Sequence, residues 1–346
     1  MIEASMPVSQ GRTALVLGAG GFIGSHMVKR LKSEGYFVVG VDLKLPEFST
    51  TEADAFEIGD LRDAHTVNEV VGFLHDYCFD EVYQFAADMG GAGFVFTGDN
   101  DAEIMHNSAV INLNVLDSLK NQKIQLGQAF KTKIFYSGSA CMYPEHNQTD
   151  PNNPNLEESS AYPANPDSEY GWEKLFSERL YLAFHRNHNI RVAVARYHNI
   201  YGPEGTWTGG REKAPAAISR KVAALKAGEQ EVEVWGDGEQ TRSFLFIDDC
   251  IEATRRLMQS DFTGPVNIGS EEMVTVNELV DIAASIAGKA VVKRHKLNAP
   301  VGVRGRNSDN NLIRNVLNWD YQISLRDGMQ KTYHWIDGQL NSSTKE

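Results

Sequence analysis

A tyrosine and a lysine four positions apart are the pair of residues that says most about chemistry in this chain. The stretch reads Tyr170-Gly-Trp-Glu-Lys174, and residues four apart lie on one face of a helix. A phenol with a pKa of about 10 is a poor base at neutral pH, but a nearby cation favours its phenolate form. A phenolate can take the proton from an alcohol, so the pair predicts oxidation of a hydroxyl group.

A serine and a cysteine lie earlier in the chain, in Ser137-Gly-Ser139-Ala-Cys141-Met-Tyr-Pro144. Ser139 closes a predicted strand and can bridge the tyrosine and a substrate oxygen. A free cysteine is more often a small buried apolar residue, but the position of Cys141 beside Ser139 favours a third titratable group at the same site. Together these residues predict an enzyme that oxidises a sugar hydroxyl and then moves a proton on a neighbouring carbon.

A glycine-rich turn follows the first predicted strand and opens a helix, as in turns that bind a dinucleotide pyrophosphate. The carboxylate that ends the next strand suits the ribose hydroxyls of adenosine and would repel a 2′-phosphate, which favours NAD. A second carboxylate after a third short strand fits an adenine contact. The residues expected to bind the cofactor are Gly18, Gly21, Phe22, Ile23, Gly24, Asp42, Asp60, Leu61, Tyr170 and Lys174.

The rest of the pattern alternates strands and helices, which predicts a Rossmann-type doubly wound parallel sheet in the α/β class. After residue 202, proline and glycine become frequent, which predicts a smaller C-terminal substrate-binding lobe. We expect an NAD-binding domain at 12–200 and a nucleotide-sugar-binding lobe mainly at 201–338, with interleaved boundaries and flexible tails at 1–11 and 341–346. The strands are expected at 13–17, 37–42, 81–86, 133–137 and 191–196, and helices at 22–34, 108–120 and 170–188.

Composition excludes several other classes of protein. The chain has 346 residues with 33 Lys and Arg against 46 Asp and Glu, a net charge of -13, which argues against nucleic acid or an anionic membrane as the main partner. No segment approaches the roughly 20 apolar residues of a membrane span. The three cysteines predict no disulfide framework and a cytoplasmic location. The ten histidines lack the spacing of ligands, so no metal is expected.

Several motifs together resemble the extended short-chain dehydrogenase/reductase family that acts on nucleotide sugars. They are the glycine turn, the set of Ser139, Tyr170 and Lys174, and Arg196-Tyr-His-Asn-Ile-Tyr-Gly-Pro203. The string Gly209-Gly-Arg-Glu-Lys-Ala-Pro215 is the most specific and is similar to the branch that epimerises GDP-mannose at C3 and C5. Residues 96–106 and 121–131 depart from the plant-type pattern, which leaves the preferred GDP-sugar open. Further similar segments are 86–91, 139–144, 235–244 and 302–311.

The chemistry of a sugar agrees with that resemblance. Oxidation at C4 acidifies the hydrogens on C3 and C5, and inversion then needs a base and an acid on opposite faces. Cys141 and Lys213 are the candidates, and the products would be GDP-L-galactose or GDP-L-gulose. The resemblance also implies a homodimer through the helices of Ser108 and Tyr170. It implies a GDP-sugar held by Gly90, Ser139, Ala140, Cys141, Asn199, Glu212, Lys213, Ala214, Lys221, Gln240, Thr241, Arg242 and Arg306.

Other functions fit the same scaffold. A 4,6-dehydratase of the family would carry Asp-Glu after its catalytic serine or threonine, whereas this chain has Ala140-Cys141. A simple 4-epimerase would not require Lys213. An epimerase of another GDP-sugar, such as a GDP-heptose, remains an alternative. A non-catalytic NAD-binding regulator is disfavoured because Tyr170 and Lys174 are both present together with Cys141 and Lys213.

Overall fold

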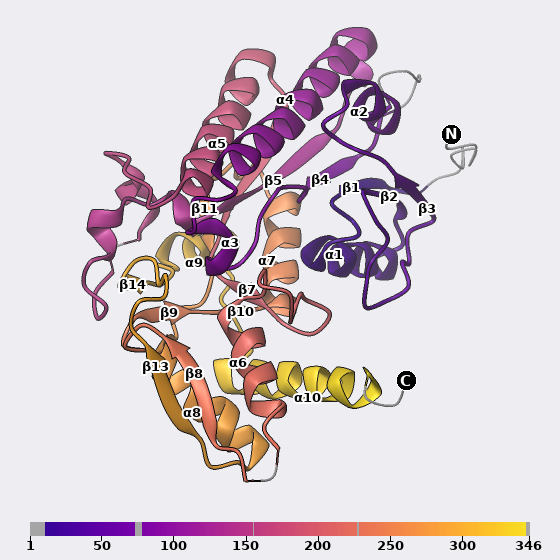
Figure 1. The fold of residues 1–346 in the computed structure, drawn as a ribbon. Helices are drawn as coiled ribbons and strands as arrows, with labels where there is room; N and C mark the ends of the chain where they lie inside the picture. Colours follow the sequence, from indigo (N-terminus) through magenta and orange to yellow (C-terminus); the bar gives the residue numbers. More distant parts are fainter. Residues whose placement is uncertain (1–10, 73–77, 155, 227, 344–346) are drawn as a thin grey trace.

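A parallel sheet of seven strands forms the centre of the molecule (Figure 1). The computed structural model describes residues 11–72, 78–154, 156–226 and 228–343. The strand order is β11-β6-β5-β4-β1-β2-β3, and neighbouring strands are parallel throughout. The doubly wound sheet predicted from the sequence is therefore confirmed. Its strands are β1 Thr13–Leu17, β2 Phe37–Asp42, β3 Ala55–Ile58, β4 Glu81–Gln84, β5 Lys133–Ser139, β6 Arg191–Tyr197 and β11 Val266–Ile268.

Helices cover both faces of this sheet, so its strands are apolar on both sides. In β1, Ala14 and Val16 pack in the core with α1 and α7, while Leu15 and Leu17 pack with α2, α4 and α5. The carboxyl ends of β1 and β4 adjoin where the strand order reverses, which is where open α/β sheets bind ligands. The helices are α1 Phe22–Ser33, α7 Ile247–Gln259, α2 Ala64–Val71, α4 Asp101–Leu126 and α5 Glu169–His188.

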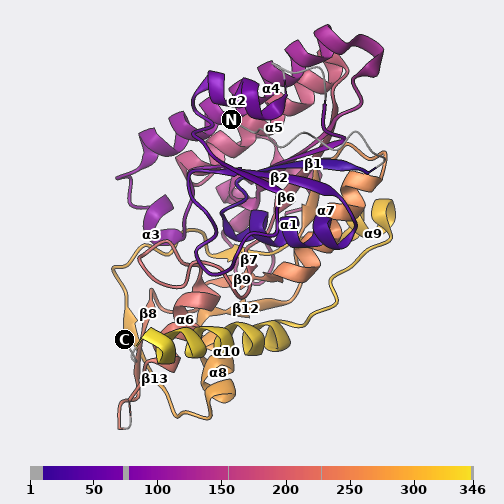
Figure 2. The same ribbon diagram turned by 90° about the vertical axis from the view of Figure 1, so that its right-hand side faces the viewer.

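The C-terminal lobe lies below the sheet in the views of Figures 1 and 2. Its helices are α6 Ala214–Ala223, α8 Val276–Ala287 and α10 Leu325–Ser343, whereas α9 Asn311–Leu317 lies beside β11 of the main sheet. Three small sheets pair β7 Ile200–Tyr201 with β10 Leu245–Phe246, β8 Glu231–Trp235 with β13 Val292–Lys296, and β9 Thr241–Ser243 with both β12 Met273–Thr275 and β14 Gly305–Arg306. Because β11 joins the main sheet, the chain returns from the lobe to the first part of the fold.

Several expected boundaries differ from the structure; for example, α4 ends at Leu126 and not at residue 120. Helix α4 begins at Asp101, well before the expected residue 108, with Asp101 and Glu103 in its first turn, where carboxylates stabilise a helix. Helix α10 continues to Ser343 and so includes part of the expected tail at 341–346. The remaining tail residues, 1–10 and 344–346, lie outside the described residues. None of the described helices is long and apolar enough to cross a membrane.

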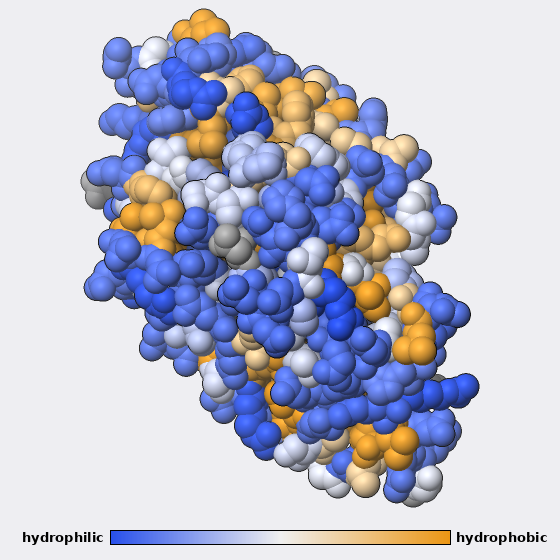
Figure 3. Space-filling view, turned by 90° about the vertical axis from the view of Figure 1, so that its left-hand side faces the viewer, coloured by the Kyte–Doolittle hydropathy of each residue, from blue (hydrophilic) through white to orange (hydrophobic). Residues whose placement is uncertain are grey.

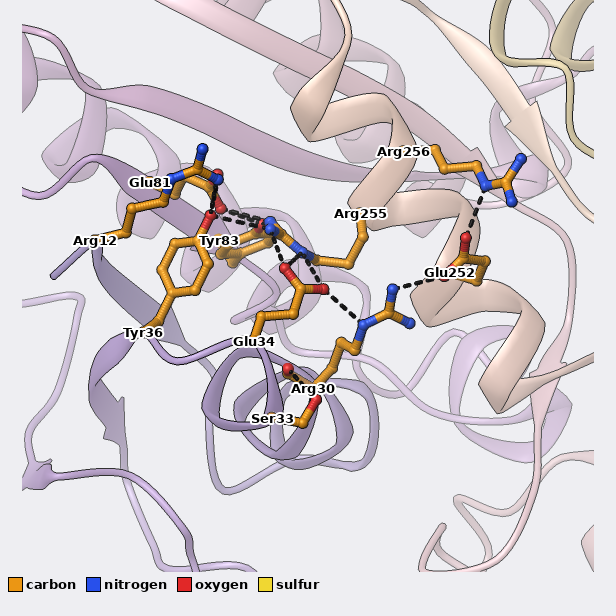
Figure 4. A network of polar contacts seen from close by, with 10 residues as sticks. All are labelled: Arg12, Arg30, Ser33, Glu34, Tyr36, Glu81, Tyr83, Glu252, Arg255 and Arg256. Atoms are coloured by element: carbon orange, nitrogen blue, oxygen red, sulfur yellow. Dashed lines mark hydrogen bonds and ion pairs between the residues drawn. The ribbon is translucent and has the colours of Figure 1, made fainter.

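A buried arginine connects the end of α1, the helix α7 and the amino end of β4 (Figure 4). This network lies at the end of the sheet opposite the carboxyl ends of the strands. Arg255 is 1% exposed. Its guanidinium donates to the Glu34 carboxylate at 2.6 Å, to Glu81 at 2.5 Å and to the hydroxyls of Tyr36 and Tyr83. Burial opposes its charge, but the Glu34 and Glu81 carboxylates raise the pKa of Arg255 above its usual range.

Candidate active site

The glycine turn between β1 and α1 depends on close backbone contacts. Gly18 has a φ of 86°, which favours glycine. A Cβ on Gly20 would lie 2.0 Å from the carbonyl oxygen of Lys44, and a Cβ on Gly24 would lie 2.0 Å from that of Gly18. Side chains at these two positions would therefore push the turn away from β2 and α1 away from the turn.

The backbone amide groups of the first turn of α1 lie beside the glycine turn. Gly21 is the N-cap, and a Cβ there would meet only the carbonyl oxygen of Gly18, at 3.3 Å. The N–H groups of Phe22, Ile23 and Gly24 belong to the first turn of α1, where amides have no intrahelical partner. The turn therefore fits a dinucleotide pyrophosphate.

The carboxylate of Asp42 lies at the end of β2 beside the same turn. Its Oδ2 accepts a hydrogen bond from the Gly20 N–H at 3.0 Å. Burial raises the pKa of Asp42, although the backbone N–H groups around it oppose the shift. Asp60 pairs with Arg62 at 2.6 Å, and Leu61 is buried. These residues fit the adenosine end of NAD, with Asp42 nearest to the glycine turn.

A cleft opens at the amino end of α1 and is closed on two sides by loops. Its lining includes Gly20, Gly21, Phe22, Ser25, residues 46–49, Glu204 and Thr206. The carboxylate of Glu204 accepts from Lys29 on α1 at 2.6 Å and also hydrogen-bonds Ser49 in the loop after β2. One carboxylate therefore connects three segments around the cleft.

The structure brings Ser139, Tyr170 and Lys174 together at the carboxyl end of β5. A hydrogen bond joins the Tyr170 hydroxyl and the Ser139 side chain. Lys174 Nζ lies 5.7 Å from the centre of the Tyr170 ring and donates to the Ser137 carbonyl at 3.1 Å. Burial raises the pKa of Tyr170, and the nearby Cys141 raises it further. Burial lowers the pKa of Lys174.

Cys141 lies in the short 3₁₀ turn Ala140–Met142 directly after β5. Its backbone N–H donates to Ser139 Oγ at 3.2 Å. Gly171 lets α5 approach this turn, because a Cβ there would lie 2.2 Å from the Cys141 carbonyl oxygen. The Cys141 sulfur accepts from Arg306 Nη1 at 2.9 Å. The turn therefore places the sulfur beside the serine and tyrosine.

Lys213 approaches the same site from the lobe, as the N-cap of α6. Its Nζ donates to the Gly90 carbonyl at 3.3 Å. Burial lowers the pKa of Lys213, while the charge of the nearby Cys141 sulfur opposes that shift and Arg306 adds to it. The structure thus brings Cys141 and Lys213 into one electrostatic environment from opposite parts of the fold. Ala214 follows as the first residue of α6.

Two arginines lie side by side on adjacent strands of the lobe. Arg242 on β9 is in register with Arg306 on β14. Among the residues that the structure describes, Arg242 donates to the carbonyls of Thr241 and Val301 and to no carboxylate. Burial and the charge of Arg306 lower the pKa of Arg242 to about 9. A partly buried cation with no carboxylate among its hydrogen-bond acceptors fits a bound anion.

The remaining expected substrate residues have protein partners. Asn199 Nδ2 donates to the Ser243 carbonyl at 3.0 Å, and Gln240 Nε2 donates to the Trp235 carbonyl at 3.0 Å. Thr241 Oγ1 hydrogen-bonds the Pro151 carbonyl. Glu212 pairs with Arg220 at 3.0 Å, and Lys221 donates to the Glu233 carbonyl at 2.9 Å. In this arrangement these side chains shape the lobe and its loops.

The sequence did not identify several residues that complete the site. Gln148 and Asp167 orient Arg306, at 2.6 Å and 2.9 Å from its Nε and Nη2. Phe94 is buried in a cluster with Tyr170, against which Cys141 packs. The pair Asp167-Ser168 could have indicated Asp167 from the sequence. Ser168 is the N-cap of α5, so Asp167 directly precedes the helix that carries Tyr170. Among the described residues, no three His, Cys, Asp or Glu side chains gather as a metal would require.

Known proteins share both the sequence and the fold. A sequence model of the NAD dependent epimerase/dehydratase family matches residues 14–269. GDP-mannose 3,5-epimerase from Arabidopsis thaliana is 44% identical over 327 residues, which cover 94% of this chain and 82% of that protein. GDP-mannose 3,5-epimerase 1 from Oryza sativa subsp. indica is similar to the same extent.

A solved structure of a related epimerase has the same fold. UDP-glucose 4-epimerase from Thermotoga maritima, determined with UDP-glucose, superimposes with a TM-score of 0.81 and 26% identity, covering 95% of this chain and 99% of that one. Its fold therefore extends over both the sheet and the lobe. The chain belongs to the NAD dependent epimerase/dehydratase family.

Proposed function

We propose that this enzyme epimerises GDP-mannose at C3 and C5 through a transient 4-keto sugar, giving GDP-L-galactose, GDP-L-gulose or both. The enzyme is an isomerase with NAD as its cofactor. The observation that carries the proposal is the meeting of Cys141 and Lys213 beside Tyr170. Relatives that are 44% identical carry the name GDP-mannose 3,5-epimerase, which supports this substrate and reaction.

Tyr170 takes the proton of the sugar C4 hydroxyl in the first step. Ser139 holds the same oxygen, because its side chain already hydrogen-bonds the Tyr170 hydroxyl. Lys174 lies 5.7 Å from the centre of the Tyr170 ring, and its charge favours the phenolate and opposes the effect of burial. A bound NAD would supply reversible hydride transfer at C4. The glycine turn and Asp42 would hold it, with its pyrophosphate at the amino end of α1.

Cys141 and Lys213 act on the 4-keto sugar. Both C3 and C5 are then next to a carbonyl, so a positioned base can remove a proton and leave an enolate. The second group returns a proton to the opposite face, which inverts the carbon. Cys141 comes from the end of β5 and Lys213 from the start of α6, so the two groups approach the sugar from different elements. Final reduction at C4 leaves no net redox change.

The lobe binds the nucleotide diphosphate in this proposal. Arg242 is the basic residue that best fits a phosphate, because among the described residues its guanidinium donates to backbone carbonyls and to no carboxylate. Arg306 lies next to Arg242 and donates a hydrogen bond to Cys141, which faces the sugar in this proposal. We assign residues 12–200 mainly to cofactor binding and 201–338 mainly to the nucleotide sugar. Asn199, Gln240 and Lys221 contribute by shaping this lobe.

Incubation with GDP-mannose in heavy water tests the proposal. Deuterium should appear at C3 and C5 of the product and of recovered substrate, and C4 should keep its original hydrogen. Absence of deuterium at both carbons would reject the reaction. Competition between GDP, UDP and dTDP tests the nucleotide: GDP should inhibit most tightly, and tightest inhibition by UDP or dTDP would reject a GDP-sugar substrate.

We also propose a homodimer formed by α4 and α5. Leu113, Trp172 and Phe176 on these helices are large apolar residues exposed to solvent. Figure 3 shows hydrophobic patches over the upper half of one face, the half in which α4 and α5 lie in Figure 1. Phe176→Glu should convert the dimer to monomer in light scattering.

The three unpaired cysteines support a reducing, cytoplasmic location.

A further inference from the structure

Two loops meet next to the proposed acid and base. One follows β4 and comprises residues 88–95, which end in the short helix α3 Ala92–Val95, and the other precedes α6 and comprises residues 207–213. The Gly91 N–H donates to the Arg211 carbonyl at 2.9 Å. A Cβ on Gly91 would lie 2.3 Å from the Glu212 carbonyl oxygen, so the backbones touch without room for a side chain. Lys213 Nζ reaches the Gly90 carbonyl across this contact.

The side chain of Arg211 crosses from the second loop to the first. Its guanidinium carbon lies 3.8 Å from the centre of the Phe94 ring. Its Nη1 lies 3.5 Å from Asp88 Oδ1, in a pair that is half exposed on the arginine side. An exposed ion pair is weak by itself, whereas a planar guanidinium over an aromatic face has a defined geometry. The stacked contact therefore fixes how the loops lie.

Both partners of Arg211 are anchored to the catalytic part of the fold. Phe94 is buried in a cluster with Ile104 and Tyr170, and Cys141 packs against this cluster. Asp88 is held by α4, because its carboxylate accepts from Asn107 Nδ2 at 3.1 Å. Arg211 thus connects the lobe loop to the side chains that surround the proposed base.

The other side of the lobe loop is fixed to α6. Glu212 accepts from the Gly210 N–H at 2.6 Å and pairs with Arg220 at 3.0 Å. Arg220 Nε also donates to the Trp207 carbonyl. These contacts give the loop its shape but do not reach the Rossmann part, which leaves Arg211 and Lys213 as the side chains that bridge the two loops in the contacts described here.

We propose that Arg211 is a positioning residue for Lys213, a role that rests on the proposed function. Arg211 lies two residues before Lys213 and clamps its loop onto Phe94 and Asp88. This contact sets the place of the Lys213 ammonium relative to Cys141, so that protons can be exchanged on the face of the sugar opposite the sulfur. Oxidation at C4 uses Tyr170, Lys174 and Ser139, which are already placed by β5 and α5.

Arg211→Ala separates these two steps. We expect the variant to lose solvent deuterium exchange at C3 and C5 by about 10- to 100-fold, since a misplaced group costs about this much. Its rate of C4 oxidation, measured by the transient absorbance of the reduced cofactor, should fall by less than about threefold from the wild-type rate, which is much less than the loss of exchange. Arg211→Lys keeps the charge and should retain part of the exchange. Arg256→Ala, which removes an exposed arginine that pairs with Glu252, is the control and should behave as wild type.

Three outcomes decide the proposal. Exchange that falls while oxidation persists supports the positioning role. Unchanged exchange in Arg211→Ala overturns it, and so does an equal loss of oxidation and exchange, because a general structural fault would lower both. If the wild-type enzyme itself exchanges no deuterium at either carbon, the proposed function fails instead, so the two failures are distinguishable.

Discussion

The sulfur of Cys141 accepts a hydrogen bond from the Arg306 guanidinium, with Sγ and Nη1 2.9 Å apart. The other nitrogens of Arg306 donate to Gln148 and Asp167, so the cation is held from three sides. Burial opposes its charge, but the Cys141 sulfur and the Asp167 carboxylate raise the pKa of Arg306. Arg306 therefore fixes the position of the Cys141 sulfur, the atom proposed to remove the sugar proton.

Replacement of Arg306 should therefore affect proton transfer as well as binding. We expect Arg306→Ala to lower solvent exchange at C3 and C5 by about 10²-fold, the loss typical of one removed charge-stabilising donor. Because Arg306 holds the Cys141 sulfur in place, its removal should lower kcat more than it raises KM. The comparison of kcat with KM is the measurement that matters.

A contact with the diphosphate alone would give the opposite pattern, a rise in KM with little change in kcat. That result would contradict the role of Arg306 at the sulfur. Arg304→Ala is a suitable control, because Arg304 is two residues away and pairs with Asp237 on the exposed surface of the lobe. It should leave kcat and the solvent exchange at C3 and C5 unchanged.

Cys141→Ala should remove the base without preventing oxidation at C4. The expected loss of exchange is about 10²- to 10⁴-fold, the usual contribution of a positioned acid or base. Reduced cofactor should still form when substrate is added, because Tyr170 and Lys174 remain. Cys78→Ala is the matched control, since Cys78 lies before β4 at the opposite edge of the sheet. Full exchange at both carbons in Cys141→Ala would contradict the assignment.

Tyr170→Phe should stop the reaction one step earlier. The phenol hydroxyl that hydrogen-bonds Ser139 is lost, whereas the ring can still pack in the cluster with Phe94. Transient absorbance of the reduced cofactor should disappear, and NAD content after gel filtration should equal that of wild type. Turnover near the wild-type rate would show that another group takes the C4 hydroxyl proton.

Local sequence patterns were sufficient to predict the sheet class, most of its strands and the glycine turn, but not the edge strand β11. The strand from residue 13, the turn at Gly18 and the strand that ends at Asp42 occur where periodicity and glycine place them. The spacing of Tyr170 and Lys174 likewise sets their relation within α5, because a helix determines which residues share a face. Such features depend on neighbours in the chain.

The partners of Arg306 could not be predicted in the same way. Cys141, Gln148 and Asp167 are 165, 158 and 139 residues away in sequence. They meet Arg306 only because β14 folds back against the segment that follows β5. No local propensity encodes that contact, and the expectation that Arg306 binds the GDP-sugar gave no indication of the thiol. The early start of α4 was missed because residues 101–107 lack a clear apolar stripe.

Glu204→Gln should weaken retention of NAD. The Glu204 carboxylate joins α1 through Lys29 and the loop after β2 through Ser49, and all three segments border the cofactor cleft. A lost charge-assisted hydrogen bond corresponds to about tenfold or more in an equilibrium constant, so dissociation of NAD should be about tenfold faster. The ratio of nicotinamide to protein after gel filtration measures this, and added NAD should restore activity. Glu252→Gln removes a carboxylate of similar pairing on the outer face of α7 and should lose no cofactor; equal retention in both variants would contradict the role.

Arg255→Met should destabilise the fold without changing the chemistry of the site. The side chain is 1% exposed and pairs with Glu34 and Glu81, so its loss leaves the Glu81 carboxylate, which is 13% exposed, without this cation, while Glu34 keeps its pair with Arg30. Removal of one partner from a buried ion pair typically costs about 3–5 kcal/mol of the free energy of unfolding. Arg256→Ala is the matched control from the next position, since that side chain is 43% exposed and its pair with Glu252 contributes about 0–1 kcal/mol. Urea unfolding followed by fluorescence should give a much lower midpoint for Arg255→Met than for Arg256→Ala. Equal midpoints would mean that water or the hydroxyls of Tyr36 and Tyr83 replace the hydrogen bonds that Arg255 gives to the two carboxylates. The buried arginine would then determine how α7 packs and would not stabilise the fold.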